Sequence, residues 1–304
     1  MEHKLEYLKE CPICGVDKLI PSHNLKDYFL SRESFIIDKC TSCGFLFTNP
    51  RPSKNQIDNY YQSENYISHS NKSKGLFAGL YQIARILNQT SKYSIIKKHT
   101  AVGNVLDIGC GTGHFLSYLK SKKWNVLGIE PNASAAEYAR NNFGLSVFDE
   151  NKLKNLENSK FNLITMWHVL EHVHNLNERL NLIHQVLGDD GVFILALPNP
   201  DSFDAKYYKN YWAAYDVPRH LYHFTKTDIS RLAERHDFYL KKIYPMKLDS
   251  FYVSILSENY KRTKLGFLRA FIIATWSNLR SKAKNPNTSS LIYVLAKKGP
   301  KFQL

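Results

Sequence analysis

Long apolar segments are absent from this chain of 304 residues. No uninterrupted hydrophobic run approaches the roughly 18 residues that a membrane-spanning helix requires. The first ten residues, MEHKLEYLKE, are too charged for the apolar centre of a secretory signal peptide. Neither an internal repeat nor a low-complexity tract occurs. These absences, together with a hydrophobic content of 43%, predict a globular protein located in the cytoplasm.

Acidic residues are scarce relative to basic ones, with 27 Asp and Glu against 41 Lys and Arg, and the formal net charge is +14. This excess favours an anionic partner such as nucleic acid, a membrane surface or an acidic substrate. A solvated, lysine-rich surface gives the same balance, so the charge alone does not decide between them. The length is sufficient for one sizeable core and a small satellite domain.

Cysteine is rare, but four of the five cysteines fall into two similar patterns. Cys11-Pro-Ile-Cys14-Gly and Cys40-Thr-Ser-Cys43-Gly each allow backbone N–H groups to wrap around a metal-bound sulfur. Four thiolates form the closed tetrahedral set of a structural zinc site, which fits a reducing compartment and leaves no position open for catalysis. Two redox pairs or coincidence are the alternatives. The pattern resembles a zinc ribbon in residues 1–50, with Phe35-Ile36-Ile37 in one strand of a β-hairpin.

The segment after the ribbon is expected to be a helical linker or cover over residues 51–100. Prolines at positions 50 and 52 end the ribbon, and the pattern from 57 to about 100 is helical. Three tyrosines lie close together there: Tyr60, Tyr61 and Tyr66. They would either cover a cofactor or substrate cleft or belong to the core or an interface, and the second role is the more common one.

The strongest pattern occupies residues 105–113, which read VLDIGCGTG. Apolar residues up to Ile108 predict a short buried strand, and apolar residues from Phe115 repeat at helical spacing. The glycines between them allow a sharp turn and a close approach of a ligand to the backbone. The following helix offers free N–H groups to a carboxylate or phosphate. The dinucleotide fingerprint G-x-G-x-x-G is not met, because His114 stands where its third glycine belongs.

With Asp107 two residues before the first glycine, this stretch resembles the first motif of class I S-adenosylmethionine-dependent methyltransferases. The resemblance covers roughly residues 102–298. It implies an α/β, Rossmann-like fold over residues 101–304, with a seven-stranded, mostly parallel sheet and helices on both faces. Later strands are expected at 124–130, 145–148, 161–166, 192–197, 241–246 and 291–296, the last two forming an antiparallel edge. A helix over 176–187 is expected to end at Gly188 and an Asp189-Asp190-Gly191 turn.

The resemblance also implies which residues bind S-adenosylmethionine. Glu130 ends the second strand, where an acid accepts hydrogen bonds from ribose hydroxyls, although a solvated loop acid is the alternative. Asp149, or Glu150 after it, would approach the adenine amino group. The candidate cofactor-binding residues are Asp107, Gly109, Cys110, Gly111, Gly113, Glu130, Pro131, Asp149 and Trp167.

The segment Trp167-His168-Val-Leu-Glu171-His172 follows the fourth strand and resembles small-molecule methyltransferases related to ubiquinone-biosynthesis enzymes. Enzymes that methylate planar amino groups typically carry Asp/Asn-Pro-Pro-aromatic at this point, and this chain does not. The segment also matches H-x-x-E-H, an inverted zinc-protease motif in which both histidines would share one helix face. Its place at a strand-to-helix turn of a methyltransferase pattern argues against a protease.

The loop over residues 211–225 is aromatic and charged. It resembles a D-x-P-x-H-x-x-x-F-T pattern that several small-molecule methyltransferases carry at the mouth of the active site. This implies His220 as a general base, a common role of histidine near neutral pH. His168 is the second catalytic candidate and His223 is held in reserve. Alternatively, these histidines pack, and Thr225 caps the helix that follows.

A long insertion at about 250–288 separates the last two strands. Its apolar stretch 265–276 has basic flanks and fits a substrate-covering lid, a dimer helix or a membrane-surface helix. The expected function is methyl transfer to oxygen or carbon of a small molecule, a sugar or a lipid-linked precursor. The alternatives are a tRNA or rRNA methyltransferase that grips phosphates, and a non-catalytic scaffold that retains the cofactor fold.

Overall fold

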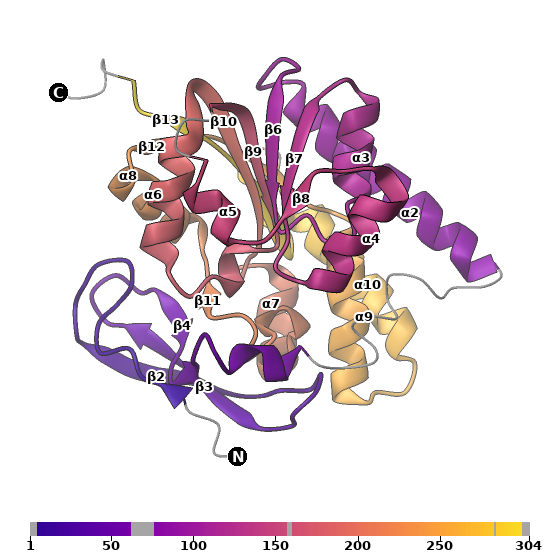
Figure 1. Ribbon diagram of the computed structural model, residues 1–304. Coiled ribbons are helices and arrows are strands. Elements are labelled where there is room, and N and C mark those ends of the chain that lie inside the picture. The colour runs from indigo at the N-terminus through magenta and orange to yellow at the C-terminus, as the bar shows by residue number, and fades with distance from the viewer. Residues whose placement is uncertain (1–4, 62–75, 157–159, 283, 300–304) are drawn as a thin grey trace.

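The computed structural model describes residues 5–61, 76–156, 160–282 and 284–299. It contains one large sheet flanked by helices and a second, smaller sheet near the N-terminus (Figure 1). Tyr66, one of the three clustered tyrosines of the sequence, lies outside the described residues.

The large sheet has seven strands, which confirms the mostly parallel sheet that the sequence predicts. In spatial order the strands are β12 (Phe238–Pro245), β13 (Ser290–Lys297), β10 (Leu187–Pro198), β9 (Phe161–Trp167), β6 (Asn104–Ile108), β7 (Asn125–Ile129) and β8 (Val147–Phe148). The strands from β10 to β8 are parallel, whereas β13 is antiparallel to both of its neighbours. The carboxyl ends of the parallel strands point toward the smaller sheet (Figure 1), and open α/β sheets bind ligands at such ends.

Helices cover both faces of this sheet because successive residues of a strand point to opposite sides. Leu106 and Ile108 pack into one core with α5, α6 and α8, whereas Val105 packs into the other with α2, α3 and α4. The bounds are α2 (Leu76–Ile96), α3 (His114–Ser121), α4 (Ala133–Phe143), α5 (Asn151–Lys154), α6 (Leu176–Val186) and α8 (Lys226–Arg235).

The fifth strand begins earlier than the sequence predicts. β10 starts at Leu187, so the glycines and acids from Gly188 to Gly191 lie within the strand instead of forming a separate turn. The register between β10 and β9 shifts between Leu187 and Val192, which makes this segment a bulge. A Cβ at Gly191 would lie 2.8 Å from the carbonyl oxygen of Phe161, so glycine permits the two backbones to approach.

The smaller sheet joins segments that are far apart in the sequence. Its order is β11, β4, β3, β2, with bounds β2 (Leu19–Lys26), β3 (Ser34–Cys40), β4 (Leu46–Thr48) and β11 (Tyr222–His223), while β1 (Leu5–Glu6) pairs with β5 (Arg51–Pro52). Strand β3 contains the predicted strand at 35–37. Strand β11 pairs antiparallel with β4, so the aromatic loop of the sequence completes the N-terminal sheet.

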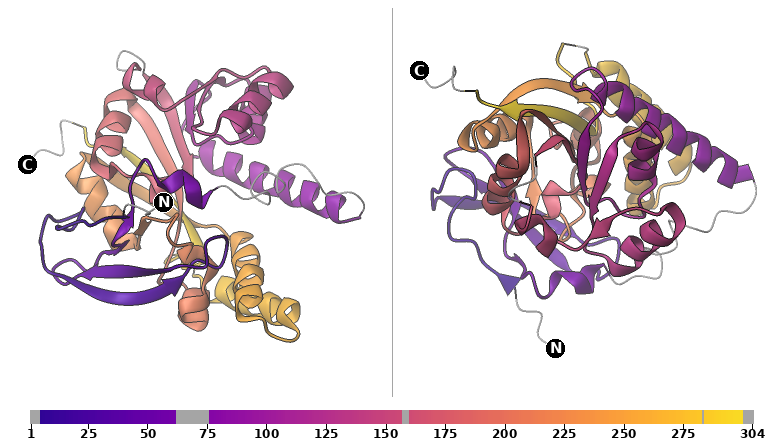
Figure 2. Two further views of the ribbon diagram at one scale, coloured as in Figure 1. Left: turned by 60° about the horizontal axis from the view of Figure 1, so that its bottom comes forward. Right: turned by 45° about the horizontal axis from the view of Figure 1, so that its top comes forward.

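The insertion forms two packed helices, α9 (Asp249–Lys261) and α10 (Gly266–Arg280), beside α7 (Phe203–Tyr208) and the short turn η4 (Ala213–Tyr215). Figure 2 shows this pair projecting beside the smaller sheet. Helix α10 buries one stripe, which includes Ala270 and Ala274, but several large apolar residues on its other faces are exposed. Among the described residues, no helix combines the length and the apolar character needed to cross a bilayer.

Candidate active site and zinc site

The glycine turn between β6 and α3 opens the backbone to a ligand. Gly109 and Gly111 have φ angles of +72° and +54°, a left-handed conformation that other residues rarely adopt. A Cβ at Gly109 would lie only 2.4 Å from Cγ2 of Val169. Apart from its two chain neighbours, no heavy atom of the described residues lies within 4 Å of the Cβ position of Gly111, so a ligand can approach the backbone there. Gly113 is the N-cap residue of α3.

Asp107 is the next-to-last residue of β6, close to this turn, and is buried. Its carboxylate accepts a hydrogen bond of 2.6 Å from the hydroxyl of Thr165 on the neighbouring strand β9. Burial raises the pKa of Asp107 to about 6, although the hydrogen bond from Thr165 and the ammonium of Lys92 oppose the rise. Asp107 therefore links two adjacent strands near their carboxyl ends.

Glu130 follows β7 and holds the turn from the neighbouring strand end. Its Oε2 accepts the N–H of Gly111 at 2.8 Å, and its Oε1 accepts the N–H of Asn132 at 2.9 Å. Burial raises the pKa of Glu130, while these two N–H groups oppose the rise. Each carboxylate oxygen retains a further lone pair, so the side chain can also accept hydrogen bonds from ligand hydroxyls.

Glu130→Ala is expected to weaken binding of S-adenosylhomocysteine, the demethylated cofactor, by roughly 10- to 100-fold, because a charge-assisted acceptor is lost. Isothermal calorimetry measures this affinity. Glu137→Ala, at an exposed acid on α4, is the matched control and should bind like the parent protein. Unchanged affinity of the Glu130→Ala variant would assign the ribose contact to another residue.

The remaining cofactor candidates lie along the same edge of the sheet. Cys110 is in the turn itself, and Pro131 is exposed at the head of α4. Asp149 follows β8, is exposed, and accepts the N–H of Asn151 at 2.8 Å. Trp167 ends β9, and its indole N–H is buried without a hydrogen-bond partner among the described residues. This orphaned donor and the open backbone at Gly111 fit a polar ligand such as an adenosyl group.

Lys92 on α2 lies at this edge although no sequence pattern indicated it. Its ammonium is 4.1 Å from the ring centre of Trp167 and 5.2 Å from that of Phe115. Burial lowers the pKa of Lys92 to about 8, while Asp107 and Asp249 act in the opposite direction. Lys92 is thus a cation beside aromatic rings, where the carboxylate of a ligand can pair with it.

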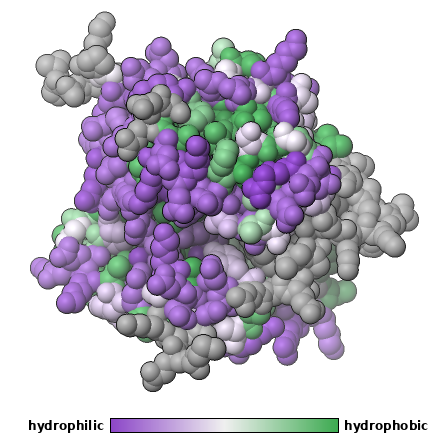
Figure 3. Space-filling model, viewed as in Figure 1, coloured by the Kyte–Doolittle hydropathy of each residue, from purple (hydrophilic) through white to green (hydrophobic). Residues whose placement is uncertain are grey.

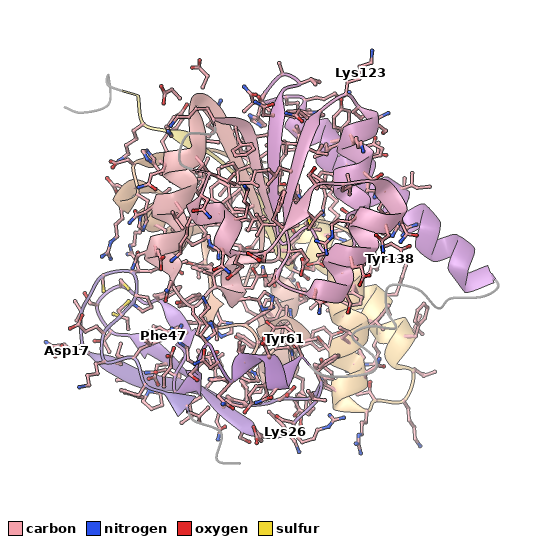
Figure 4. All side chains as sticks on the ribbon, in the orientation of Figure 1. Asp17, Lys26, Phe47, Tyr61, Lys123 and Tyr138 are labelled. Atoms are coloured by element: carbon pink, nitrogen blue, oxygen red, sulfur yellow. The ribbon has the colours of Figure 1, made fainter. Side chains whose placement is uncertain are left out.

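Both catalytic candidates of the sequence, His168 and His220, meet around Glu171. The carboxylate of Glu171 is fully buried, and its Oε1 is 3.4 Å from Nδ1 of His168. Potential ligand atoms of Glu171, His172 and His220 lie within 4.8 Å of one another. The rings of His172 and His220 meet edge to face with their centres 4.7 Å apart. Figure 4 shows Tyr61 between the two sheets, and its hydroxyl is 2.8 Å from Nδ1 of His172.

The charges in this cluster depend on one another. Burial opposes ionisation of Glu171, but the adjacent His168 and the nearby His172 and His220 lower its pKa. Burial acts against a charged His168, yet Glu171 raises the pKa of that ring. Burial and the adjacent His220 lower the pKa of His172 to about 4, so His172 is neutral at physiological pH.

The H-x-x-E-H segment does not form the helix face that a zinc protease would need. His168 has a φ angle of +58°, and Leu170–His172 is a short 3-10 turn. His168 and His172 therefore do not lie one turn apart on one α-helix. This geometry removes the protease alternative, and the cluster forms instead with His220 from the distant loop.

A backbone contact fixes the tautomer of His220. Its Nδ1 lies 2.9 Å from the carbonyl oxygen of Ala214. Because a carbonyl only accepts hydrogen bonds, Nδ1 carries the proton and the neutral ring has its lone pair at Nε2. That Nε2 lies 4.0 Å from the carboxylate of Asp216.

The rest of the loop follows the packing alternative. His223, the reserve candidate, is buried with its Nε2 3.3 Å from the hydroxyl of Thr48, and its ring packs against Tyr215. Burial lowers the pKa of His223 well below its ordinary value. Thr225 caps α8 in a reciprocal capping box with Asp228. The packing alternative thus describes His223 and Thr225.

The four cysteines of the two C-x-x-C-G patterns come together beside the smaller sheet. Sulfur distances of 3.5 Å separate Cys11 from Cys43 and Cys14 from Cys40, and all four sulfurs lie within 4.8 Å of one another. Zinc bound by four thiolates spaces its sulfurs about 3.8 Å apart. The glycine after each pattern donates its N–H to the carbonyl of the first cysteine at 2.8 Å. This donor set fits the structural zinc ion that the sequence predicts.

Arg219 joins the smaller sheet to the aromatic loop. Its buried guanidinium donates to the carboxylates of Asp27 at 3.1 Å and Asp216 at 2.6 Å, and to the backbone oxygen of Tyr60 at 3.1 Å. It also lies 4.5 Å from the ring centre of Phe29. Asp216, Arg219 and His220 are close in the loop, so this network positions the loop beside the cluster around Glu171.

The strand order, the glycine turn after β6 and the acid after β7 together define a Rossmann-like α/β fold whose strand ends are open to a ligand. A family model described as a methyltransferase domain matches residues 77–243. The chain belongs to this methyltransferase family.

The relatives match parts of the chain. An uncharacterized protein of Methanocaldococcus jannaschii is 35% identical over 108 residues, which cover 34% of this chain and 41% of that protein. An uncharacterized protein of Haemophilus influenzae is 30% identical over 146 residues, or 42% of this chain and 57% of that protein. The chain thus spans about half the length of these curated relatives. A solved SAM-dependent methyltransferase from Archaeoglobus fulgidus is 18% identical, with a TM-score of 0.48 over 70% of this chain and 94% of that one.

Proposed function

We propose that the protein transfers a methyl group to oxygen or carbon of a compact acceptor, which binds between the large and the smaller sheet. The observation that carries this proposal is the meeting of His168, Glu171 and His220 at the strand ends that also carry the cofactor candidates. The aromatic loop, which pairs with β4 of the smaller sheet, carries His220 to this cluster. No Pro-Pro motif of base-methylating enzymes follows β9.

The proposed roles divide between two sides of the site. Asp107, Glu130 and the glycine turn would hold S-adenosylmethionine, which supplies an electrophilic methyl group when it is bound. Alignment of acceptor and donor provides about 7–11 kcal/mol of barrier reduction in favourable cases. His168 and His220 are the proposed acceptor-side groups, and the lone pair of neutral His220 lies at Nε2.

His220→Ala is expected to lower turnover by about 100-fold or more, the usual range for an acid–base group, while the affinity for S-adenosylhomocysteine stays nearly unchanged. Methyl transfer to the acceptor from labelled cofactor measures the first quantity, and calorimetry measures the second. His184→Gln, a half-buried histidine on α6, is the control. A normal rate in the His220→Ala variant would remove this residue from the reaction.

The acceptor itself is identified by mass spectrometry of cell extract incubated with labelled cofactor. We expect a labelled small molecule, sugar or lipid-linked precursor. Figure 3 shows hydrophilic side chains over much of one face of the molecule, with an apolar patch on its upper part. Salt-sensitive incorporation of label into tRNA or rRNA would instead support the nucleic-acid alternative. Cofactor binding without any labelled product would support the non-catalytic scaffold.

Peripheral contact with an anionic membrane is part of this proposal, because helix α10 is apolar on more than its packed side. Phe267 is 74% exposed and Leu279 72% exposed, and the exposed cations Arg262 and Lys264 lie before the helix. A basic, apolar surface of this kind binds anionic lipid headgroups. It would place the site near a lipid-linked acceptor.

Phe267→Ser combined with Leu279→Ser is expected to reduce cosedimentation with phosphatidylglycerol vesicles several-fold, since less apolar surface enters the bilayer. Ile20→Ser, at an exposed apolar residue of β2, is the control and should sediment like the parent protein. A dimer that dissociates in the double variant, without vesicle binding by the parent, would assign the face to a second copy of the chain.

We also propose the cytoplasm as the location, supported by five cysteines that form no disulfide among the described residues.

A further inference from the structure

The cluster around Glu171 has an electrostatic property that the proposed function does not use. Both carboxylate oxygens of Glu171 are buried and have no hydrogen-bond partner among the described residues. The separation of 3.4 Å from Nδ1 of His168 leaves that contact short of a good hydrogen bond. A buried carboxylate without donors is costly, and proteins compensate it with a cation or with hydrogen bonds.

Two histidines of the cluster, His172 and His220, present acceptors as well. Nδ1 of His172 is 2.9 Å from the carbonyl oxygen of Arg219, and Nδ1 of His220 is 2.9 Å from that of Ala214. Both rings therefore donate from Nδ1 and, when neutral, carry their lone pairs at Nε2. In metal sites, a ligating histidine commonly donates the N–H of its other ring nitrogen to a backbone carbonyl, which fixes the orientation of the ring.

The spacing is suitable for a shared ion. Potential ligand atoms of Glu171, His172 and His220 lie within 4.8 Å of one another. Two imidazoles bound to one ion at about 2.1 Å and at roughly right angles place their ring centres about 4.5 Å apart. The ring centres of His172 and His220 are 4.7 Å apart.

We propose that Glu171, His172 and His220 bind a divalent first-row transition-metal ion, separate from the zinc of the four cysteines. Two imidazoles and one carboxylate leave coordination positions open. The inference rests on the proposed function, because those open positions would bind an oxygen of the acceptor next to the atom that is methylated. It gives the Nε2 lone pair of His220 a specific partner, the metal ion, and selects acceptors that carry oxygen at or beside the methylated atom.

Mn²⁺ is the probe, because it prefers oxygen and nitrogen ligands and does not compete with zinc for thiolates. The zinc-loaded full chain is titrated with Mn²⁺ while electron paramagnetic resonance measures the free ion. We expect about one bound Mn²⁺ per chain, and at least a tenfold loss of affinity in the Glu171→Gln and His172→Asn variants. Glu178→Gln, at an exposed acid on α6, should bind Mn²⁺ like the parent protein.

Spin-echo spectroscopy of the parent protein supplies a test that needs no variant. Bound Mn²⁺ should show coupling to imidazole nitrogen, and an ion without nitrogen coupling, or no specifically bound ion, would overturn the metal site. Calorimetry with S-adenosylhomocysteine measures cofactor affinity separately from Mn²⁺ binding, so the two proposals can be tested independently. If the parent protein transfers methyl groups to an acceptor but binds no Mn²⁺ at this site, this inference fails and the proposed function stands. If the parent protein binds Mn²⁺ at this site but methylates no acceptor, the proposed function fails and, with it, the acceptor role of the ion.

Discussion

Removal of zinc from the four-cysteine site is expected to unfold the smaller sheet and to abolish methyl transfer. Structural zinc contributes about 10–16 kcal/mol to the folding of small zinc domains, and β3 and β4 flank the second C-x-x-C-G pattern. Because β11 pairs with β4, unfolding of this sheet would release the loop that carries His220. The Cys14→Ser variant should lose about one equivalent of zinc by elemental analysis and lack activity.

Ser42→Ala, at an exposed position inside the second pattern, is the matched control and should keep its zinc and its activity. Zinc added back after chelation should restore the parent protein. If zinc remains in the Cys14→Ser variant and disappears in His172→Ala, the structural ion lies in the histidine cluster and the ribbon assignment is wrong.

Arg219→Met is expected to lower the free energy of unfolding by about 3–5 kcal/mol, the usual cost of removing one partner of a buried ion pair. Asp27 is 1% exposed, and the variant would leave its carboxylate and that of Asp216 without their cation. Urea unfolding followed by circular dichroism measures the loss. Arg32→Met, at an exposed arginine of the same N-terminal sheet region, should change stability by less than about 0.5 kcal/mol.

A double variant separates the ion pair from packing on Phe29. Asp27→Asn combined with Arg219→Met should cost less than the sum of the two single changes, because the double variant no longer buries the carboxylate of Asp27 without its cation. Strict additivity would mean that Arg219 stabilises the junction through its contact with the Phe29 ring and the backbone oxygen of Tyr60.

The large sheet could be predicted because short stretches of the sequence each indicate one of its strands. Runs of apolar residues at 105–108 and 161–166 become buried central strands, and the acids after the first two strands lie where parallel strands must bring them. The grouping of the four cysteines was also predictable, since two C-x-x-C patterns are typical of a four-thiolate zinc site. The start of β10 was not, because glycines and acids at 188–191 favour a turn locally, and only pairing with β9 keeps this segment in the sheet.

The acceptor side of the site was predictable only in part. The sequence singles out His220 and His168, but the distance of His220 from Glu171 depends on the path of a loop that follows a separate sheet. A helical H-x-x-E-H segment was the local expectation, and the positive φ of His168 is a tertiary result. No sequence pattern placed Lys92 at the site, because its position there depends on the packing of α2 against the strand ends.

The pairing of β11 with β4 bears on how this enzyme could be shortened or recombined. The ring of Phe45 lies 6.0 Å from that of Tyr222 and 5.4 Å from that of Phe224, so the two parts of the chain share one aromatic core. A fragment that begins at residue 101 would expose the rings of Tyr222 and Phe224 and leave β11 unpaired. The ribbon is therefore not an exchangeable module, and a minimal catalytic fragment of this chain must retain it.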